Sequence, residues 1–157
     1  MRRNDRVIRM ALFVTASVMA LAMSTGAFAQ EKDPMSPVGV WKTVDDATGK
    51  AKSLIKIWEK NGKLYGTVIK LIDPSEPDPV CDKCEGKLHN KPIVGMTIMR
   101  GLSKDGDEYS GGTILDPENG KTYKVLIQVL PGGKKLKVRG YIGISLLGRT
   151  QHWHRVK

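Results

Sequence analysis

The sequence lacks the short motifs that mark the common catalytic and nucleotide-binding sites. Its 157 residues contain no serine nucleophile elbow, no phosphate-binding loop and no dinucleotide-binding glycine fingerprint. The acidic residues Asp45, Asp46, Asp116 and Glu118 fall in turn-like sequences, where carboxylates bond to local backbone. We therefore expect a binding or interaction protein rather than an enzyme, with no catalytic residue, no cofactor and no bound metal.

Helical periodicity is also missing. After the signal-like N-terminal segment, no stretch repeats its apolar residues at the spacing of a helix. Apolar and polar residues alternate instead, and Asn61-Gly62 and Pro131-Gly132-Gly133 are typical of tight turns. Eight strands are predicted, at 38–43, 53–58, 64–72, 94–102, 108–115, 121–130, 134–141 and 150–156. Short strands joined by hairpin turns predict an all-β fold, an eight-stranded antiparallel up-and-down barrel.

The one long apolar run lies near the N-terminus. Four arginines precede it among the first nine residues, and Ala27-Phe28-Ala29 follows it as a small-x-small cleavage site. At about 13 residues, the run is too short to span a bilayer comfortably. The residue directly after the cleavage site is Gln30 and not a cysteine, so a lipid anchor is not expected. We expect residues 1–29 to be a cleaved signal peptide, which places the mature protein in the periplasm and not across the membrane.

The rest of the chain is basic without a dense basic cluster. Residues 30–37 include two prolines and are predicted to be a flexible lead-in, and residues 38–157 to be a single barrel domain. Residues 30–157 hold 22 basic and 15 acidic residues, a formal net charge of +7. Scattered lysines are typical of solvated strand faces, and the alternative is attraction to an anionic surface of the cell envelope. Nucleic-acid binding is not expected, because no recognition motif is present.

Cysteine is scarce, with Cys81 and Cys84 as the two examples. Both lie in the proline-rich segment 73–92, which has no periodicity and is long for a loop of a compact domain. A disulfide is favoured, because exported proteins are oxidised and a redox pair usually begins a helix. A redox pair and a metal site that includes His89 stay open as alternatives, although structural zinc takes four ligands.

A set of short motifs runs through residues 38–156. They are Gly39-Val40-Trp41, Asp46-Ala47-Thr48-Gly49-Lys50, Lys52-Ser53, Asn61-Gly62-Lys63-Leu64-Tyr65-Gly66, Cys81-Asp82-Lys83-Cys84, Gly111-Gly112-Thr113-Ile114-Leu115-Asp116-Pro117, Gly120-Lys121-Tyr123 and the stretch 138–153. With these motifs the chain resembles the bacterial domain of unknown function 2147. The resemblance implies an exported, single-domain, calycin-like or lipocalin-like barrel, and it implies no particular reaction.

The first strand also carries part of a pattern that is similar to the lipocalin signature. In lipocalins a Gly-x-Trp element places an indole under an arginine near the last strand, and the pair seals the closed end. Here Gly39 and Trp41 match the first half, and Arg139, Arg149 and Arg155 are the candidates for the second. The chain is shorter than a typical lipocalin and has no clear C-terminal helix, so a smaller calycin barrel is the alternative.

The residues expected to line a cavity are aromatic or contain sulfur. They are Tyr65, Met96, Met99, Tyr123, Tyr141 and Trp153, with Arg139 as the anchor for a polar head group. The leading hypothesis is a small, mostly apolar ligand, fatty-acid-like or lipid-derived, with the segment 73–92 as a lid. Two alternatives stay open: a filled barrel that acts as a structural or interaction protein through its basic face, and a barrel enzyme.

Overall fold

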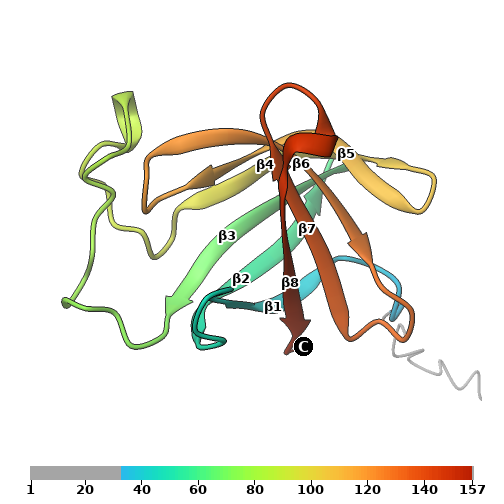
Figure 1. The fold of residues 1–157 in the computed structure, drawn as a ribbon, viewed down its shortest axis with the longest axis horizontal. Coiled ribbons are helices and arrows are strands. Elements are labelled where there is room, and N and C mark those ends of the chain that lie inside the picture. Colours follow the sequence, from blue (N-terminus) through green and yellow to red (C-terminus); the bar gives the residue numbers. More distant parts are fainter. Residues whose placement is uncertain (1–32, 157) are drawn as a thin grey trace, which may run out of the picture. The chain divides into compact units, whose positions relative to one another are not determined.

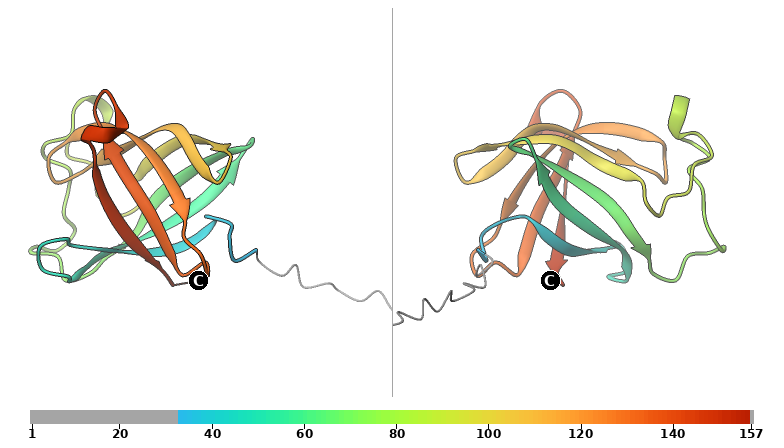
Figure 2. Two further views of the ribbon diagram at one scale, coloured as in Figure 1. Left: turned by 45° about the vertical axis from the view of Figure 1, so that its right-hand side comes forward. Right: turned by 180° about the vertical axis from the view of Figure 1, so that it is seen from behind.

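The computed structural model describes residues 33–156, and the predicted signal peptide at 1–29 lies outside them. The strands are β1 (Gly39–Val44), β2 (Ala51–Lys60), β3 (Lys63–Leu71), β4 (Thr97–Asp105), β5 (Glu108–Asp116), β6 (Lys121–Val129), β7 (Lys135–Tyr141) and β8 (Arg149–Arg155). Each strand pairs antiparallel with the next in the chain, and β8 pairs with β1 to close a barrel (Figures 1 and 2). The predicted fold class is therefore confirmed.

Closure joins the first and last strands as the sequence predicts. Trp41 lies opposite Arg155 in the β1–β8 ladder, and Lys42 lies opposite His154. The Asn-Gly hairpin between β2 and β3 also forms, because Asn61 and Gly62 both adopt positive φ (53° and 72°), as a two-residue primed turn requires.

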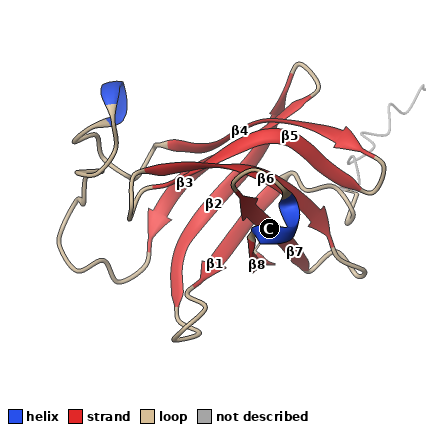
Figure 3. Cartoon of the chain, turned by 45° about the horizontal axis from the view of Figure 1, so that its top comes forward, coloured by secondary structure: helices blue, strands red, loops and turns tan. Residues whose placement is uncertain are grey.

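Helical structure is confined to two short 3-10 turns in the connections (Figure 3). These are η1 (Gly86–Leu88), between β3 and β4, and η2 (Ser145–Leu147), between β7 and β8. Within residues 33–156, no helix has the length and apolar character needed to cross a membrane.

Strand β4 begins at Thr97, three residues later than predicted. Residues 94–96 form a turn instead, in which the Met96 amide donates to the Ile93 carbonyl at 3.1 Å. The Gly95 amide and the Met96 carbonyl also bond to the backbone of Val68, so this turn fixes the end of the long 72–96 connection against β3.

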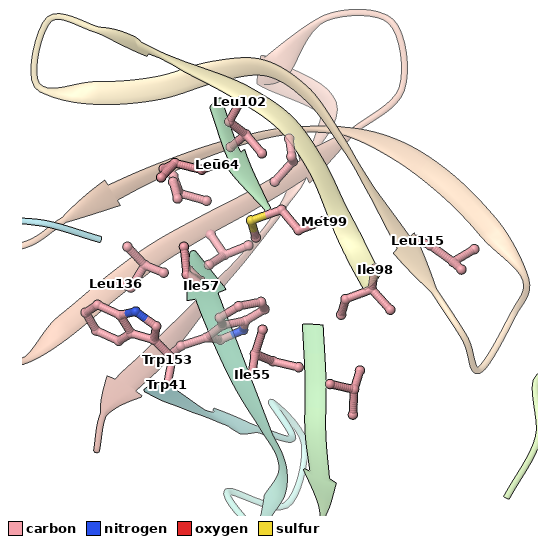
Figure 4. Packing of buried hydrophobic residues seen from close by; sticks show 14 of the residues in the cluster. Trp41, Ile55, Ile57, Leu64, Ile98, Met99, Leu102, Leu115, Leu136 and Trp153 are labelled. Carbon is pink, nitrogen blue, oxygen red and sulfur yellow. The ribbon is translucent and has the colours of Figure 1, made fainter. Parts of the chain in front are cut away.

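Inward-facing side chains from all eight strands fill the barrel (Figure 4). Trp41, Ile57, Met99 and Leu136 have no exposed surface, and Trp153 is 2% exposed. Alternation along each strand produces this core, because every second side chain of a strand points to the same face.

The expectation that Tyr65 lines a cavity is wrong, because β3 faces the other way. Leu64 and Val68 are buried inside the barrel, whereas Tyr65 lies on the outer face and Ile69 is exposed. Gly66 is the inward residue between Leu64 and Val68, and a Cβ there would approach the Met99 Cβ to 3.0 Å. This close approach suits glycine, so the strand presents its other face, with Tyr65, to the outside.

Trp41 and Arg155 close the end of the barrel at which β1 begins. The indole Nε1 of Trp41 donates to the Pro37 carbonyl at 2.7 Å, and the guanidinium of Arg155 lies 4.2 Å from the centre of the indole. Arg155 also donates to the carbonyls of Gly133 at 2.6 Å and Ser36 at 2.7 Å. Arg155 is therefore the arginine that stacks on Trp41.

The described part of the predicted flexible lead-in lies against this closed end. Pro37 is fully buried, and the Pro34 carbonyl accepts a hydrogen bond of 3.0 Å from Arg155. Residues 33–37 are therefore ordered against the barrel, which corrects the expectation of a flexible lead-in for them. Their backbone carbonyls accept hydrogen bonds from the Arg155 guanidinium in place of water.

Candidate functional site

The opposite end of the barrel carries the four connections that shape the candidate site. They are the turns at 45–50 and 117–120, the long connection 72–96 and the loop 142–148. In Figure 1, the 72–96 connection extends at the left of the barrel and the 142–148 loop rises at the top. We call this end the mouth.

A disulfide between Cys81 and Cys84 holds the long connection in shape, so the predicted disulfide is confirmed. Cys81 is fully buried and Cys84 is 4% exposed, and both pack into the hydrophobic core cluster. In this oxidised form neither sulfur is a thiolate that could bind a metal, because the two are bonded to each other. His89 instead contacts the Cys84 carbonyl through Nδ1 at 3.0 Å.

The disulfide loop packs against the turn between β5 and β6. The Lys83 ammonium donates to the Glu118 carbonyl at 3.0 Å, and the Cys81 Sγ lies 3.4 Å from the Pro117 carbonyl oxygen. Gly120 permits the contact, because a Cβ at this position would sit 1.9 Å from the Lys83 carbonyl oxygen. The segment 73–92, which is the predicted lid, therefore packs against the β5–β6 turn through specific contacts.

A cleft of about 520 Å³ lies between this lid, the β5–β6 turn and the 142–148 loop. Its lining consists of the aliphatic residues Leu88, Leu115 and Ile142, the polar residues Glu85, Lys121 and Thr122, and Cys84 and Gly120. A second hollow, of about 410 Å³, lies on the other side of Leu88 against Met96 and Arg100. The lining of the mouth cleft mixes apolar and polar side chains in about equal number, so a molecule bound there would meet both kinds of group.

Ion pairs tie the turns of the mouth together. Arg149 donates to the Asp46 carboxylate through Nε at 2.8 Å and Nη2 at 2.6 Å, which raises the pKa of Arg149. Lys52 bridges two turns, because its ammonium contacts the carboxylates of both Asp45 and Glu118. These pairs are solvent-exposed, so each contributes little to stability.

Four of the predicted lining residues are inside or buried. Met99 and Trp153 belong to the core, Tyr123 is half-buried on the inner face of β6, and Met96 is 5% exposed at the base of the lid. The hydroxyl of Tyr123 accepts a hydrogen bond of 3.1 Å from Asn119, which places it near the mouth.

The other three predicted lining residues lie on the outer face, which corrects the expected placement. Tyr65 stacks on Trp58 with ring centres 4.8 Å apart. Tyr141 and Arg139 alternate with inward Val138 on β7 and therefore point outward.

Arg139 binds the 142–148 loop rather than an internal ligand. Its guanidinium donates to the Ser145 carbonyl at 2.6 Å, the Leu146 carbonyl at 3.0 Å and the Thr150 hydroxyl at 2.6 Å. It therefore holds the loop of the mouth in shape.

The residues of the mouth cleft were missed by sequence reasoning. Leu88 lies in a segment without periodicity, and Lys121 immediately follows a turn, so neither position carries a pattern. Ile142 had a usable signal, because it begins an apolar stretch between two strands. Among residues 33–156, no three His, Cys, Asp or Glu side chains gather in a way that could hold a metal ion.

Comparisons with known proteins agree with this architecture. The family described as "uncharacterized protein conserved in bacteria (DUF2147)" matches residues 39–155. Among solved structures, protein HP1028 of Helicobacter pylori, described as belonging to the lipocalin family, superposes with a TM-score of 0.68. The two are 25% identical, and the match covers 78% of this chain and 84% of HP1028. No curated protein matches the sequence. The chain is therefore a member of the bacterial DUF2147 family, and its fold is lipocalin-like.

Proposed function

We propose that this protein binds a small, mostly apolar molecule in the cleft at the mouth of its barrel. The observation that carries the proposal is the cleft of about 520 Å³, lined by Leu88, Leu115 and Ile142 and rimmed by Lys121. The lipocalin-like fold supports small-molecule binding in general, because barrels of this kind hold ligands at their open ends.

The ligand is placed at the mouth because side chains occupy the interior below it. Met99, Leu102, Val125 and Ile127 are fully buried against one another in the middle of the barrel. An apolar chain would lie between the lid and the β5–β6 turn, where it would cover Leu88 and Leu115. A carboxylate or phosphate head would meet the ammonium group of Lys121, so a fatty-acid-like or lipid-derived molecule fits the lining best.

We propose further that the protein is exported to the periplasm. Residues 1–29 have the order of charges, apolar residues and cleavage site that a secretory signal requires. The Cys81–Cys84 disulfide fits an oxidising compartment. N-terminal sequencing of protein from a periplasmic fraction tests this, and a first residue other than Gln30, or recovery only from the cytoplasm, would contradict it.

Titration with a fluorescent fatty acid tests the binding proposal. Lys121→Gln should weaken binding about fivefold to tenfold, the value of one partly solvated charge-assisted hydrogen bond. Leu88→Ser should weaken it as well, because it replaces an apolar contact of the cleft with a hydroxyl. Lys124→Gln is the matched control, since Lys124 is exposed on the outer face of β6. Equal affinities of the two lysine variants would contradict the proposed site.

The packed interior favours a second candidate, an interaction protein of the cell envelope that holds no ligand. In this case the basic chain would act through its outer surface. A purified protein that binds no member of a fatty-acid panel would favour this candidate over the first.

A further inference from the structure

The loop between β7 and β8 exposes an unusual density of aliphatic side chains. Ile142 is 68% exposed, Ile144 60%, Leu146 82% and Leu147 80%, and all four lie within six residues. Single exposed aliphatic residues are ordinary on a protein surface, but a contiguous exposed group marks an interaction site. In Figure 1, this loop, which contains η2, rises beyond the ends of β7 and β8. We call residues 142–147 the apolar tip.

The apolar tip is held in this position by polar contacts at its base. Arg139 donates to the carbonyls of Ser145 and Leu146, and its third bond to Thr150 fixes it to β8. Gly148 permits the return of the chain, because a Cβ there would lie 2.6 Å from the Gly140 carbonyl oxygen. The aliphatic side chains are therefore presented outward by a bonded loop.

The charged residues that flank the apolar tip in the sequence are both basic. No charged residue lies between Arg139 and Arg149 in the sequence. Exposed Lys124 lies opposite Tyr141, at the base of the tip, in the β6–β7 ladder. Arg149 pairs with Asp46, and the carboxylates of Asp45 and Asp116 also lie near its guanidinium, so the charge left free at the base of the tip comes from Arg139 and Lys124. An aliphatic tip with basic flanks matches the chemistry of a bilayer that contains anionic lipids.

We propose that the apolar tip inserts into the interface of an anionic lipid bilayer and docks the barrel there with its mouth at the membrane. Ile142 belongs both to the tip and to the lining of the mouth cleft, so docking brings the cleft to the lipid surface. A second copy of the chain is a poorer occupant, because a stable protein interface buries roughly 800 Å² and 20–30 residues on each side. Six residues fall well short of that.

Flotation with lipid vesicles tests the proposal without any cleft ligand. Vesicles of equal phosphatidylglycerol and phosphatidylcholine should carry the mature protein at low salt. Leu146→Ser/Leu147→Ser should lower the partition coefficient at least about tenfold, because two exposed leucines no longer enter the apolar phase. Ile69→Ser is the matched control, since Ile69 is an exposed aliphatic residue on the barrel wall, and it should float like the wild type. A double variant that floats like the wild type, or a wild type that does not float, overturns the proposal.

A fluorescence measurement checks that the tip itself enters the lipid. A tryptophan in Leu147→Trp should shift its emission to the blue on addition of the same vesicles, and brominated lipid should quench it. An unshifted and unquenched emission overturns the proposal, as does tip-dependent dimerisation in sedimentation without vesicle binding. Failure of this proposal can be distinguished from failure of the proposed function. Fatty-acid titration of Lys121→Gln tests the cleft, and vesicle flotation of the wild type and the tip variants tests the tip.

Discussion

The guanidinium carbon of Arg155, in the last strand, lies 4.2 Å from the centre of the Trp41 indole, in the first strand. The same two residues face each other in the ladder that closes the barrel. Four backbone carbonyls, from 34, 36, 38 and 133, accept hydrogen bonds from this guanidinium. One side chain therefore joins the lead-in, the β6–β7 turn and both closing strands.

Arg155→Ala should lower the free energy of unfolding by about 2–3 kcal/mol. The variant loses the cation–π contact, worth about 0.5–2 kcal/mol, and leaves backbone carbonyls without their charged donor. Burial lowers the pKa of this guanidinium, which shows that part of its hydration is replaced by protein. Urea denaturation of the mature protein measures the effect. Arg149→Ala is the control, since that exposed ion pair should cost under about 1 kcal/mol, and equal losses in the two variants would contradict the assignment.

Cys81→Ser should open the lid while the barrel stays folded. The disulfide closes a very short loop, so its loss should cost only about 2 kcal/mol in the chain-entropy estimate. Trypsin is a sensitive probe, because Lys83 and Lys87 lie exposed in this segment. Cleavage there should accelerate severalfold relative to the wild type, with little change in the circular dichroism of the sheet. If the segment in the Cys81→Ser variant resists trypsin as well as it does in the wild type, packing on the β5–β6 turn holds the segment in place without the disulfide.

Strand facing is tested by a pair of truncations on neighbouring strands. Met99→Ala should cost about 2–5 kcal/mol, because Met99 is fully buried and a cavity remains. Tyr65→Ala should cost about 1 kcal/mol, since it removes only the stacking on Trp58 at the outer face. A larger loss for Tyr65→Ala would restore the facing that the sequence pattern predicts.

The turn at 45–50 should have a measurable acid response. Hydrogen bonds from the Thr48 hydroxyl and amide lower the pKa of Asp45. A carboxyl whose folded pKa is depressed contributes stability above its ordinary pKa of about 3.9, and this contribution disappears as the pH falls through the folded value. Thr48→Val should raise the pKa of Asp45 toward the ordinary value, and carboxyl carbon NMR measures it. An unchanged titration would mean that the hydroxyl contributes nothing.

Much of the fold follows from local sequence, because alternation and turn residues act over a few positions. The cleanest strand, β6, has Val125, Ile127 and Val129 buried on one face as its alternation indicates. Facing fails in β3 because apolar residues occur on both faces there, and the decision depends on the contact between Gly66 and Met99 from another strand. The fit of neighbouring side chains, which no local pattern reveals, makes that decision.

The candidate site was less predictable because its parts come from distant segments. Lys83 and Gly120 meet across two connections, and only the folded barrel brings them together. The role of Arg139 could not be read either, since its partners are backbone carbonyls of its own loop. Trp41 was accessible through the Gly-x-Trp pattern, but the choice of Arg155 required the strand register.

Native mass spectrometry of the mature protein, purified from the periplasm without detergent, tests the central claim most directly. The account predicts a defined extra mass of a few hundred daltons or less on the wild type, and organic extraction should remove it. The Leu88→Ser variant should lack this extra mass, and the Lys124→Gln variant should retain it. Such a small apolar ligand would match the size of the mouth cleft, about 520 Å³. A bare protein, unshifted by an added panel of fatty acids, would contradict ligand binding and leave a filled barrel that acts through its surface.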